Sequence, residues 1–277
     1  MKLRTSFLVL FICLPLFFVK PQKDFSLGSY NFSKAIQVRL DKSLTEISGL
    51  TFSGEKLFTH NDEAGIIFQL EPGSGKILKI FSLGDKKLRK DFEGIDFTKD
   101  KFYLITSNGD IYSFSEAKDK ASAGYKVYST GLTRSDIEGL CYDESSNALL
   151  VACKGSAGKS YKGMKAIFLF DLKQNKLNTK PKFLISLKEL KDKYNIKNFS
   201  PSGIEKNDKT GTFFILSSNE RAIVELSSDG KILSAIKLND IKHRQPEGIT
   251  FAPDGSLLIS DEGANGNATL TRYELKN

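Results

Sequence analysis

Five short and similar stretches decide the fold that this sequence predicts. They are Glu46-Ile-Ser-Gly-Leu50, Asp91-Phe-Glu-Gly-Ile95, Asp136-Ile-Glu-Gly-Leu140, Ser200-Pro-Ser-Gly-Ile204 and Gln245-Pro-Glu-Gly-Ile249. Their glycines stand at positions 49, 94, 139, 203 and 248, so the separations are 45, 45, 64 and 45 residues. The chain therefore repeats one unit every 45 residues, and one unit carries an insertion of about 19 residues.

Each unit shows the same order of β-rich runs, separated by turns of Gly, Asn, Asp and Ser. The first run begins after the motif glycine, and a second apolar run follows a turn. The third run recurs over 65–70, 110–114, 166–170, 222–226 and 269–273, and a fourth over 76–83, 125–130, 182–187 and 231–238. Four antiparallel strands per unit are typical of a β-propeller, whose blades pack around a central channel. The sequence predicts an all-β, five-bladed β-propeller, with six blades as the alternative.

The two ends of the chain indicate how the ring closes. The fifth unit lacks a fourth run, because only Glu274 to Asn277 follow its third. Residues Ala35 to Leu40 precede the first motif at the interval at which fourth runs precede the others. We predict that this N-terminal strand completes the last blade and removes an open sheet edge. In the inserted segment, Leu187, Leu190 and Tyr194 fall at helical spacing and predict one short surface helix.

The N-terminus has the pattern of an export signal. After a basic start, an apolar run extends from Phe7 to Val19, and Lys20-Pro-Gln-Lys23 follows it. The run is shorter than the roughly 20 residues that span a bilayer as a helix, but no small-x-small cleavage site follows closely. The predicted organisation is an export signal or N-terminal membrane anchor (1–23), a linker (24–34) and the propeller domain (35–277). We expect a cell-envelope protein, either periplasmic or anchored to the plasma membrane.

Composition and charge exclude several classes of protein. Hydrophobic residues make up 40% of the chain and charged residues 27%, which rules out wholesale disorder and a multi-span membrane protein. The net charge of +8 comes from 41 basic and 33 acidic residues. Four of the basic residues lie within 1–23, and the other lysines are scattered among acids without a basic stripe. We therefore expect no nucleic-acid partner, and we expect a monomer.

Outside the leader the chain has two cysteines, Cys141 and Cys153. If they lie on adjacent strands around the turn from Asp143 to Asn147, Cys153 falls opposite Gly139, and the two thiols are poorly placed for a disulfide. Two buried free thiols are predicted.

Polar residues recur at the two strand ends that should meet at one edge of each blade. The start of the first strand and the end of the second share an edge in an antiparallel sheet. A first set lies at or just before the motif glycines: Glu46, Ser48, Asp91, Glu93, Asp136, Glu138, Ser202 and Glu247. A second set follows the second strands and includes His60, Asn61, Asp62, Ser107, Asn108, Lys154, Asn219, Asp261 and Glu262. Because first strands line the channel, Glu93, Glu138 and Glu247 are expected to converge at its mouth.

Converging carboxylates need something that neutralises them. Two of them about 5 Å apart repel by roughly 3 kcal/mol at an effective dielectric constant of about 20. A bound cation, protonation, or basic side chains such as Lys154, Arg221 and Arg244 are the options. An oxygen-rich, thiol-poor site suits Ca²⁺ or Mg²⁺ better than zinc, and we take Ca²⁺ as the expected ion.

The candidate residues fall into two groups, and no catalytic residue is assigned. The candidate metal ligands are Glu93, Glu138, Glu247, Asp62, Asp261 and Glu262. The candidate ligand-binding residues are His60, Asn61, Ser107, Asn108, Lys154, Ser202 and Asn219. A purely structural alternative stays open, in which each glutamate only accepts hydrogen bonds from the next blade. The two histidines lie in no His-Glu-x-x-His motif, and Gly-x-Ser-x-Gly is absent, so a serine triad or a histidine-rich metal site is not expected.

The combined motifs resemble those of the SdiA-regulated β-propeller family, also called the YjiK/CarP family, over about residues 40–275. The resemblance rests on the Asp-x-Glu-Gly-[Ile/Leu] units, on Ser200-Pro-Ser-Gly and on the closing Pro-Glu-Gly-Ile with Ser260-Asp-Glu. It implies an envelope protein with an N-terminal signal or membrane anchor and a propeller outside the cytoplasm. Similarity to calcium-dependent propeller phosphatases of the phytase type is weaker. Ser48 and Ser202 replace the motif glutamate, so a ring of metal ligands would be incomplete on two sides.

Three functions stay open at this point. The leading one is a non-catalytic module that binds a small ligand or an envelope protein at the channel mouth, next to a divalent cation. The alternative is a calcium-dependent phosphatase or esterase, in which the ion polarises the substrate while Glu93, Glu138 or Glu247 activates water. A pure scaffold would need neither a metal nor a pocket.

Overall fold

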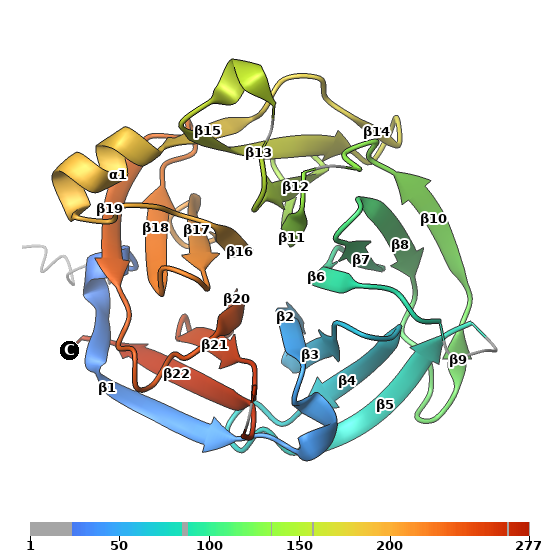
Figure 1. Ribbon diagram of the computed structural model, residues 1–277. Helices are drawn as coiled ribbons and strands as arrows, with labels where there is room; N and C mark the ends of the chain where they lie inside the picture. The colour runs from blue at the N-terminus through green and yellow to red at the C-terminus, as the bar shows by residue number, and fades with distance from the viewer. Residues whose placement is uncertain (1–23, 85–87, 134, 157, 265, 277) are drawn as a thin grey trace, which may run out of the picture.

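Five sheets are arranged as blades around one axis in the computed structural model, which describes residues 24–84, 88–133, 135–156, 158–264 and 266–276 (Figure 1). The innermost strands β2, β6, β11, β16 and β20 surround that axis. The predicted five-bladed, all-β architecture is therefore confirmed.

The blades follow one another along the chain, each written here from its inner to its outer strand. The first contains β2 (Ile47–Ser53), β3 (Lys56–Asn61), β4 (Ile66–Leu70) and β5 (Ile77–Leu83), and the second β6 (Phe92–Phe97), β7 (Phe102–Thr106), β8 (Asp110–Phe114) and β10 (Tyr125–Ser129). The third contains β11 (Ile137–Asp143), β12 (Ala148–Cys153) and β13 (Met164–Asp171), with β14 (Lys176–Leu177) and β15 (Phe183–Ser186) both paired to β13. The fourth contains β16 (Pro201–Asn207), β17 (Thr212–Ser217), β18 (Ala222–Leu226) and β19 (Ile232–Lys237). The fifth contains β20 (Pro246–Phe251), β21 (Leu257–Asp261), β22 (Thr269–Leu275) and β1 (Tyr30–Arg39).

Four short elements complete the described structure. Strand β9 (Ser122–Ala123) pairs in parallel with the outer edge of β5. Three turns of 3-10 helix are η1 (Leu27–Ser29), η2 (Lys42–Leu44) and η3 (Lys159–Tyr161).

The N-terminal strand closes the ring, as predicted. Strand β1 pairs antiparallel with β22, so that both ends of the domain share the fifth sheet. The strand begins at Tyr30, five residues before the expected start at Ala35 and inside the segment assigned to a linker. Leu27 and Tyr30 are buried in the core between the fourth and fifth blades, and the Tyr30 hydroxyl donates to the Gly255 carbonyl at 3.0 Å. Large apolar side chains thus extend the ordered domain into 24–34.

A β-bulge interrupts the innermost strand pair of every blade at the motif. In the second blade Phe92 pairs with Thr106 and Gly94 with Ile105, which leaves the residue between them without a partner. The same irregularity recurs in the other four inner pairs. A bulge bends the strand and re-aims the side chain of the extra residue. The residues at this position are Ser48, Glu93, Glu138, Ser202 and Glu247.

The bulge also corrects the expected cysteine register. Cys153 pairs with Ile137 rather than with Gly139, because the hairpin register already places Gly139 opposite Ala152 and the extra residue at the bulge shifts the ladder by one more position. Cys141 pairs with Leu150, and both cysteines are buried free thiols, as predicted.

Glycine follows the bulge because the backbone of a neighbouring blade passes directly against it. A Cβ atom on Gly94 would lie 2.8 Å from the backbone nitrogen of Leu140, and one on Gly203 would lie 2.7 Å from the Glu247 carbonyl oxygen. On Gly248 it would lie 2.4 Å from the carbonyl oxygen of Ser48. The repeated glycine thus sets how closely consecutive inner strands approach.

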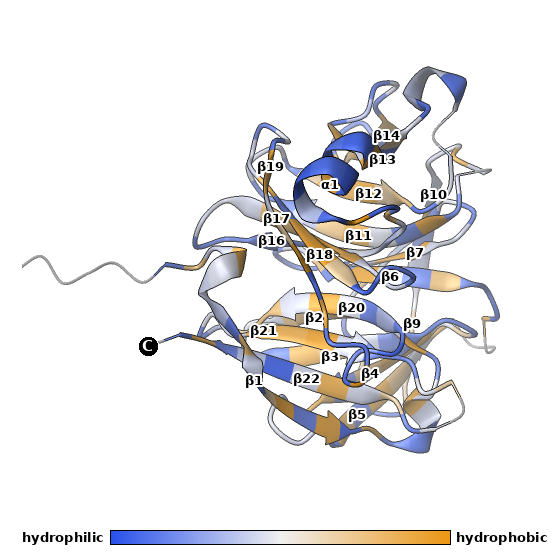
Figure 2. Ribbon diagram, turned by 60° about the vertical axis from the view of Figure 1, so that its left-hand side comes forward, coloured by the Kyte–Doolittle hydropathy of each residue, from blue (hydrophilic) through white to orange (hydrophobic). Residues whose placement is uncertain are grey.

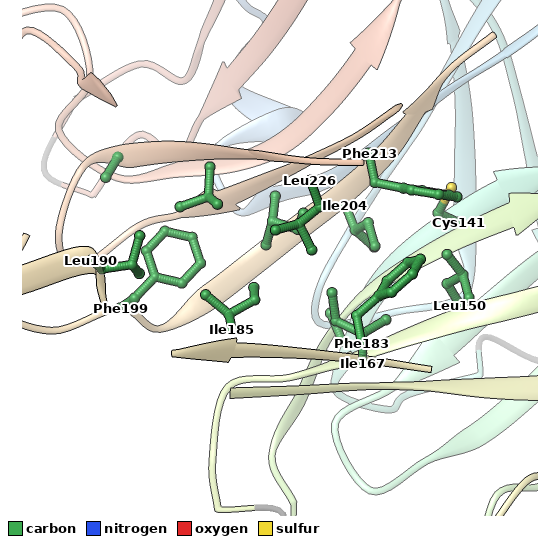
Figure 3. Packing of buried hydrophobic residues seen from close by; sticks show 14 of the residues in the cluster. Cys141, Leu150, Ile167, Phe183, Ile185, Leu190, Phe199, Ile204, Phe213 and Leu226 are labelled. Atoms are coloured by element: carbon green, nitrogen blue, oxygen red, sulfur yellow. The ribbon is translucent and has the colours of Figure 1, made fainter. Parts of the chain in front are cut away.

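Apolar side chains fill the spaces between neighbouring blades. Figure 3 shows the cluster between the third and fourth blades, where Phe183 and Phe213 lie near Leu150 and Ile204. The predicted surface helix is present as α1 (Leu187–Tyr194), and its Leu190 joins this cluster. Figure 2 shows α1 largely in hydrophilic colours beside strands with hydrophobic stretches.

The described residues include no helix that is long and apolar enough to cross a bilayer. The predicted signal or anchor, residues 1–23, lies outside the described residues.

The close approach at the motif glycines can be tested by one added methyl group. We expect Gly248→Ala to lower the free energy of unfolding by about 1–3 kcal/mol, the usual cost of overpacking, because the methyl group would overlap the Ser48 carbonyl. Denaturant unfolding measures the change. Gly124→Ala, with no atom within 4 Å of the new methyl group, is the control and should be nearly neutral. Equal effects of the two substitutions would contradict the packing role.

Candidate functional site at the channel mouth

The starts of the first strands and the ends of the second strands lie together on one face, here called the channel mouth. The Asp62 amide donates to the Glu46 carbonyl at 3.1 Å, and the Glu262 amide donates to the Gln245 carbonyl at 3.0 Å. Further bonds link neighbouring blades: Phe92 donates to the Asp62 carbonyl at 2.7 Å. The two polar sets identified in the sequence therefore share this face.

The five bulged residues divide into two chemical types at the axis. Glu93, Glu138 and Glu247 line one narrow axial pocket, so these glutamates do converge. Ser48 donates from its hydroxyl to the Glu93 carbonyl at 2.9 Å, and Ser202 donates to the Pro246 carbonyl at 2.9 Å. The interblade clip considered for the glutamates is thus made by the two serines.

Burial disfavours negative charge on the axial glutamates, and one lysine contacts one of them. Burial, followed by the charge of Glu138, raises the pKa of Glu93 to about 10. Burial raises the pKa of Glu247 well above its ordinary value as well. The pKa of Glu138 is also raised by burial, although Lys154 lies 2.8 Å from its carboxylate and opposes the shift. The raised pKa values favour protonated carboxyl groups at Glu93 and Glu247, and Lys154 lies against Glu138.

A second acidic group at the channel mouth, here called the rim cluster, consists of Glu46, Asp62 and Glu262. One carboxylate oxygen of each residue lies within 4.8 Å of the others, and all three residues are partly buried. Burial first and the charge of Glu46 second raise the pKa of Asp62 to about 6 and that of Glu262 to about 7. Among the described residues, no lysine or arginine forms an ion pair with any of the three.

One carboxylate oxygen of the rim cluster, and the side-chain oxygen of the residue before it in the chain, lack hydrogen-bond donors among the described residues. Oδ1 of Asp62 and Oδ1 of the preceding Asn61 are buried and have no partner among the described residues. A buried acceptor without a donor costs about 1–3 kcal/mol. An unpartnered carboxylate oxygen within a group of three carboxylates is what a hard cation would satisfy.

The side chains of His60 and Asp261 form hydrogen bonds within their own blades and are not members of the rim cluster. The imidazole of His60 is fully buried, its Nε2 accepts from the Gly49 amide at 3.1 Å, and burial lowers its pKa to about 4. The Asp261 carboxylate lies 2.8 Å from Nδ1 of His243, whose Nε2 lies 2.6 Å from the Tyr273 hydroxyl. Neither residue belongs to the rim cluster, although Asp261 lines a cavity with Glu262, and its Oδ1 lacks a hydrogen-bond partner among the described residues.

The other candidate residues have separate surroundings. Asn108 accepts from the Thr106 hydroxyl at 2.5 Å in the turn after β7, next to the half-buried Ser107. Asn219 is exposed in the turn after β17.

Glu46 is the residue of the rim cluster that the sequence analysis places in the polar set but not among the candidate metal ligands. The sequence feature that could have identified Glu46 as a ligand is its place as the acidic first residue of the first motif, one residue before β2 begins.

A family model described as SdiA-regulated matches residues 25–265, most of the chain. The chain belongs to the SdiA-regulated family. No curated protein matches it significantly.

Solved structures of several other proteins share the fold. The glutaminyl cyclase of Myxococcus xanthus is 13% identical, with a TM-score of 0.58 over 87% of this chain and 96% of that chain. A luciferin-regenerating enzyme is 12% identical, with a TM-score of 0.55 over 87% and 95% of the two chains. A glucose dehydrogenase is 10% identical, with a TM-score of 0.54 over 87% and 100%. At such identities, and with such varied functions, the likeness of this SdiA-regulated propeller to them shows the fold alone.

The raised pKa values at the rim predict how stability depends on pH. In metal-free protein the folded state binds protons at Asp62 and Glu262 more tightly than the unfolded state does. The resulting stabilisation is complete below the unfolded pKa values and is lost as the pH rises through about 6 and about 7. We expect the free energy of unfolding to fall between pH 5 and pH 8, measured by urea denaturation in EDTA. Glu262→Gln should flatten that decline, whereas exposed Glu55→Gln should not; the same slope in all three proteins would refute the assignment.

Proposed function

We propose that the protein is an exported cell-envelope module that binds a divalent cation, Ca²⁺ by its chemistry, at the rim cluster. The observation that carries this proposal is the convergence of Glu46, Asp62 and Glu262 without a basic partner among the described residues, with Oδ1 of Asp62 buried and without a hydrogen-bond donor. Neutralisation by a cation would offset both the cost of burying these carboxylates and their mutual repulsion, which together raise the pKa values of Asp62 and Glu262.

The donor set favours a hard ion over a transition metal. Glu46, Asp62 and Glu262 offer carboxylate oxygens, and Asn61 offers an amide oxygen. The imidazole of His60 is already engaged by the backbone. Oxygen ligands on several segments match the preference of Ca²⁺, which accepts six to eight such ligands in flexible geometry. Main-chain carbonyls and water would complete the coordination shell.

The cavity beside the rim cluster indicates what the cation would help to bind. It measures about 390 Å³, and its lining includes Glu262 together with three basic residues, Arg39, Lys242 and Arg244. Guanidinium groups recognise carboxylate and phosphate through paired hydrogen bonds. A small anionic ligand would therefore meet arginine side chains on one side and the cation on the other. The leader pattern supports export, and we propose a monomer that works in the periplasm or on the outer face of the plasma membrane.

The same cavity favours a second candidate function, a calcium-dependent hydrolase for phosphate or other esters. Bound Ca²⁺ would supply polarisation of the ester. Arg39 and Arg244 would orient an anionic substrate, and a rim carboxylate would accept a proton from water. We place binding first, because the rim carboxylates would be occupied by the ion and the other carboxylate that lines the cavity, Asp261, is already hydrogen-bonded to His243.

Calcium should stabilise the folded protein through the rim cluster. At a concentration 100-fold above Kd, a ligand specific for the folded state adds about 2.7 kcal/mol, which corresponds to about 5–10 °C in Tm for a domain of this size. We expect this rise in differential scanning fluorimetry when Ca²⁺ is added to EDTA-treated protein. The double variant Asp62→Asn, Glu262→Gln should lose the rise, while Glu55→Gln should keep it. An unchanged Tm in the unmodified protein at millimolar Ca²⁺ would exclude the site.

Turnover separates the two functions. With Ca²⁺ present, we expect p-nitrophenyl phosphate and p-nitrophenyl acetate to be hydrolysed no faster than in buffer alone, as monitored by p-nitrophenolate absorbance. Calcium-dependent hydrolysis that disappears in Glu262→Gln and in Arg244→Ala would instead establish the hydrolase and reverse our order of preference.

A further inference from the structure

The end of the channel opposite the channel mouth carries a second polar ring. Two residues after each motif glycine, every inner strand places one side chain there. The five residues are Thr51, Asp96, Cys141, Glu205 and Thr250. Because the inner strands all run away from the channel mouth, this ring is separate from the rim cluster.

A cavity of about 390 Å³ opens on this end. Four members of the ring, including Asp96 and Glu205, belong to its lining. The next residue along each strand adds an aromatic side chain in four of the five blades. These partly exposed aromatic residues are Phe52, Phe97, Tyr142 and Phe251. The cavity thus combines carboxyl groups with aromatic walls.

The hydrogen bonds of Asp96 and Glu205 leave their charge uncompensated. Asp96 is 6% exposed and accepts from the Thr51 hydroxyl at 2.8 Å, from the Phe97 amide at 2.6 Å and from the Tyr142 amide. Glu205 accepts from the Lys206 amide at 3.0 Å. All of these donors are neutral groups. One carboxylate oxygen of each residue and Sγ of Cys141 lie within 4.8 Å of one another.

The lysines around the cavity do not compensate the two carboxyl groups. Nζ of Lys206 lies 2.7 Å from Asp143, and Nζ of Lys99 lies 3.1 Å from Glu144. Lys209 is exposed and forms no ion pair with either carboxyl group among the described residues. Burial raises the pKa values of both Asp96 and Glu205, and a neighbouring carboxylate adds to each rise, Asp208 at Asp96 and Asp96 at Glu205.

We propose that this cavity is a second binding site, which takes a small organic ammonium ion. The positive charge would lie against Asp96 and Glu205, and the carbon atoms bonded to nitrogen would contact Phe52, Phe97 and Phe251. Aromatic faces attract such cations by about 0.5–2 kcal/mol each, and quaternary ammonium groups are commonly bound in this way. This inference does not depend on the proposed calcium site at the other end of the channel.

A metal ion fits this cavity less well than an ammonium ion. Cys141 would have to supply a thiolate, yet its side chain is fully buried and burial raises its pKa well above the ordinary value. Its Sγ also lies within hydrogen-bond reach of the Tyr142 carbonyl, at 3.6 Å. Both carboxylate oxygens of Asp96 already accept hydrogen bonds. The aromatic walls would make no contribution to metal binding.

Isothermal titration calorimetry with two molecules of the same shape tests the proposal. The charged probe is choline, and the uncharged probe is 3,3-dimethylbutan-1-ol, in which carbon replaces the nitrogen. We expect choline to bind and the alcohol to bind at least 10-fold more weakly. Glu205→Gln and Phe97→Leu should each weaken choline binding by 5-fold or more, and circular dichroism shows whether each variant is folded. Glu262→Gln, at the opposite end, is the matched control and should leave choline binding unchanged.

The remaining outcomes each overturn the assignment. Equal binding of choline and the alcohol would show an apolar pocket in which the carboxyl groups have no role. Choline binding that survives both Glu205→Gln and Phe97→Leu, or no binding at millimolar concentration, would place no ammonium site here. Zinc or manganese binding that is lost in Cys141→Ser would make the cluster a metal site. Should Glu205→Gln fail to fold, Phe97→Leu and the uncharged probe still decide the question.

Discussion

The structure depends on the close contact between the inner strands of neighbouring blades. A bulge precedes each motif glycine, and the glycine accepts the backbone of the adjacent blade at a distance that no side chain allows. This one arrangement sets the radius of the ring and turns the bulged residue towards the axis. Where the bulged residue is serine, as at Ser48 and Ser202, it ties one blade to the next. Where it is glutamate, the repeat leaves buried acid at the axis.

Both ends of the channel therefore carry more acidic groups than basic groups, with different consequences. Along the axis, burial disfavours negative charge on Glu93, and Lys154 lies against Glu138. At the rim, Glu46, Asp62 and Glu262 have no such partner among the described residues, and this open position is where we place a cation. At the far end, aromatic side chains surround Asp96 and Glu205, which suits an organic cation instead. We therefore propose that a scaffold built from one repeat carries two sites of different chemistry.

The 45-residue period was sufficient to predict five blades, the strand order and the closure by β1, because motif spacing and strand alternation are properties of the chain itself. The convergence of the axial glutamates followed from strand direction alone. The hydrogen-bond partners of individual side chains could not be predicted in the same way. The sequence pattern could not show that His60 and Ser260 bind the amides of the motif glycines, or that His243 holds Asp261, since these depend on register after a bulge. The rim cluster combines Glu46 and Asp62 of the first blade with Glu262 of the fifth blade, and the sequence pattern could not show that these two blades bring the three residues together.

The central claim is that the crowded carboxylates of the rim cluster hold a divalent cation. The most direct measurement is a crystal structure of the protein grown with Ca²⁺ and examined by anomalous scattering at a long wavelength. The account predicts one anomalous peak within 2.3–2.6 Å of oxygens from Glu46, Asp62 and Glu262. A structure without that peak, in which protons or a lysine side chain neutralise these three residues, would contradict it.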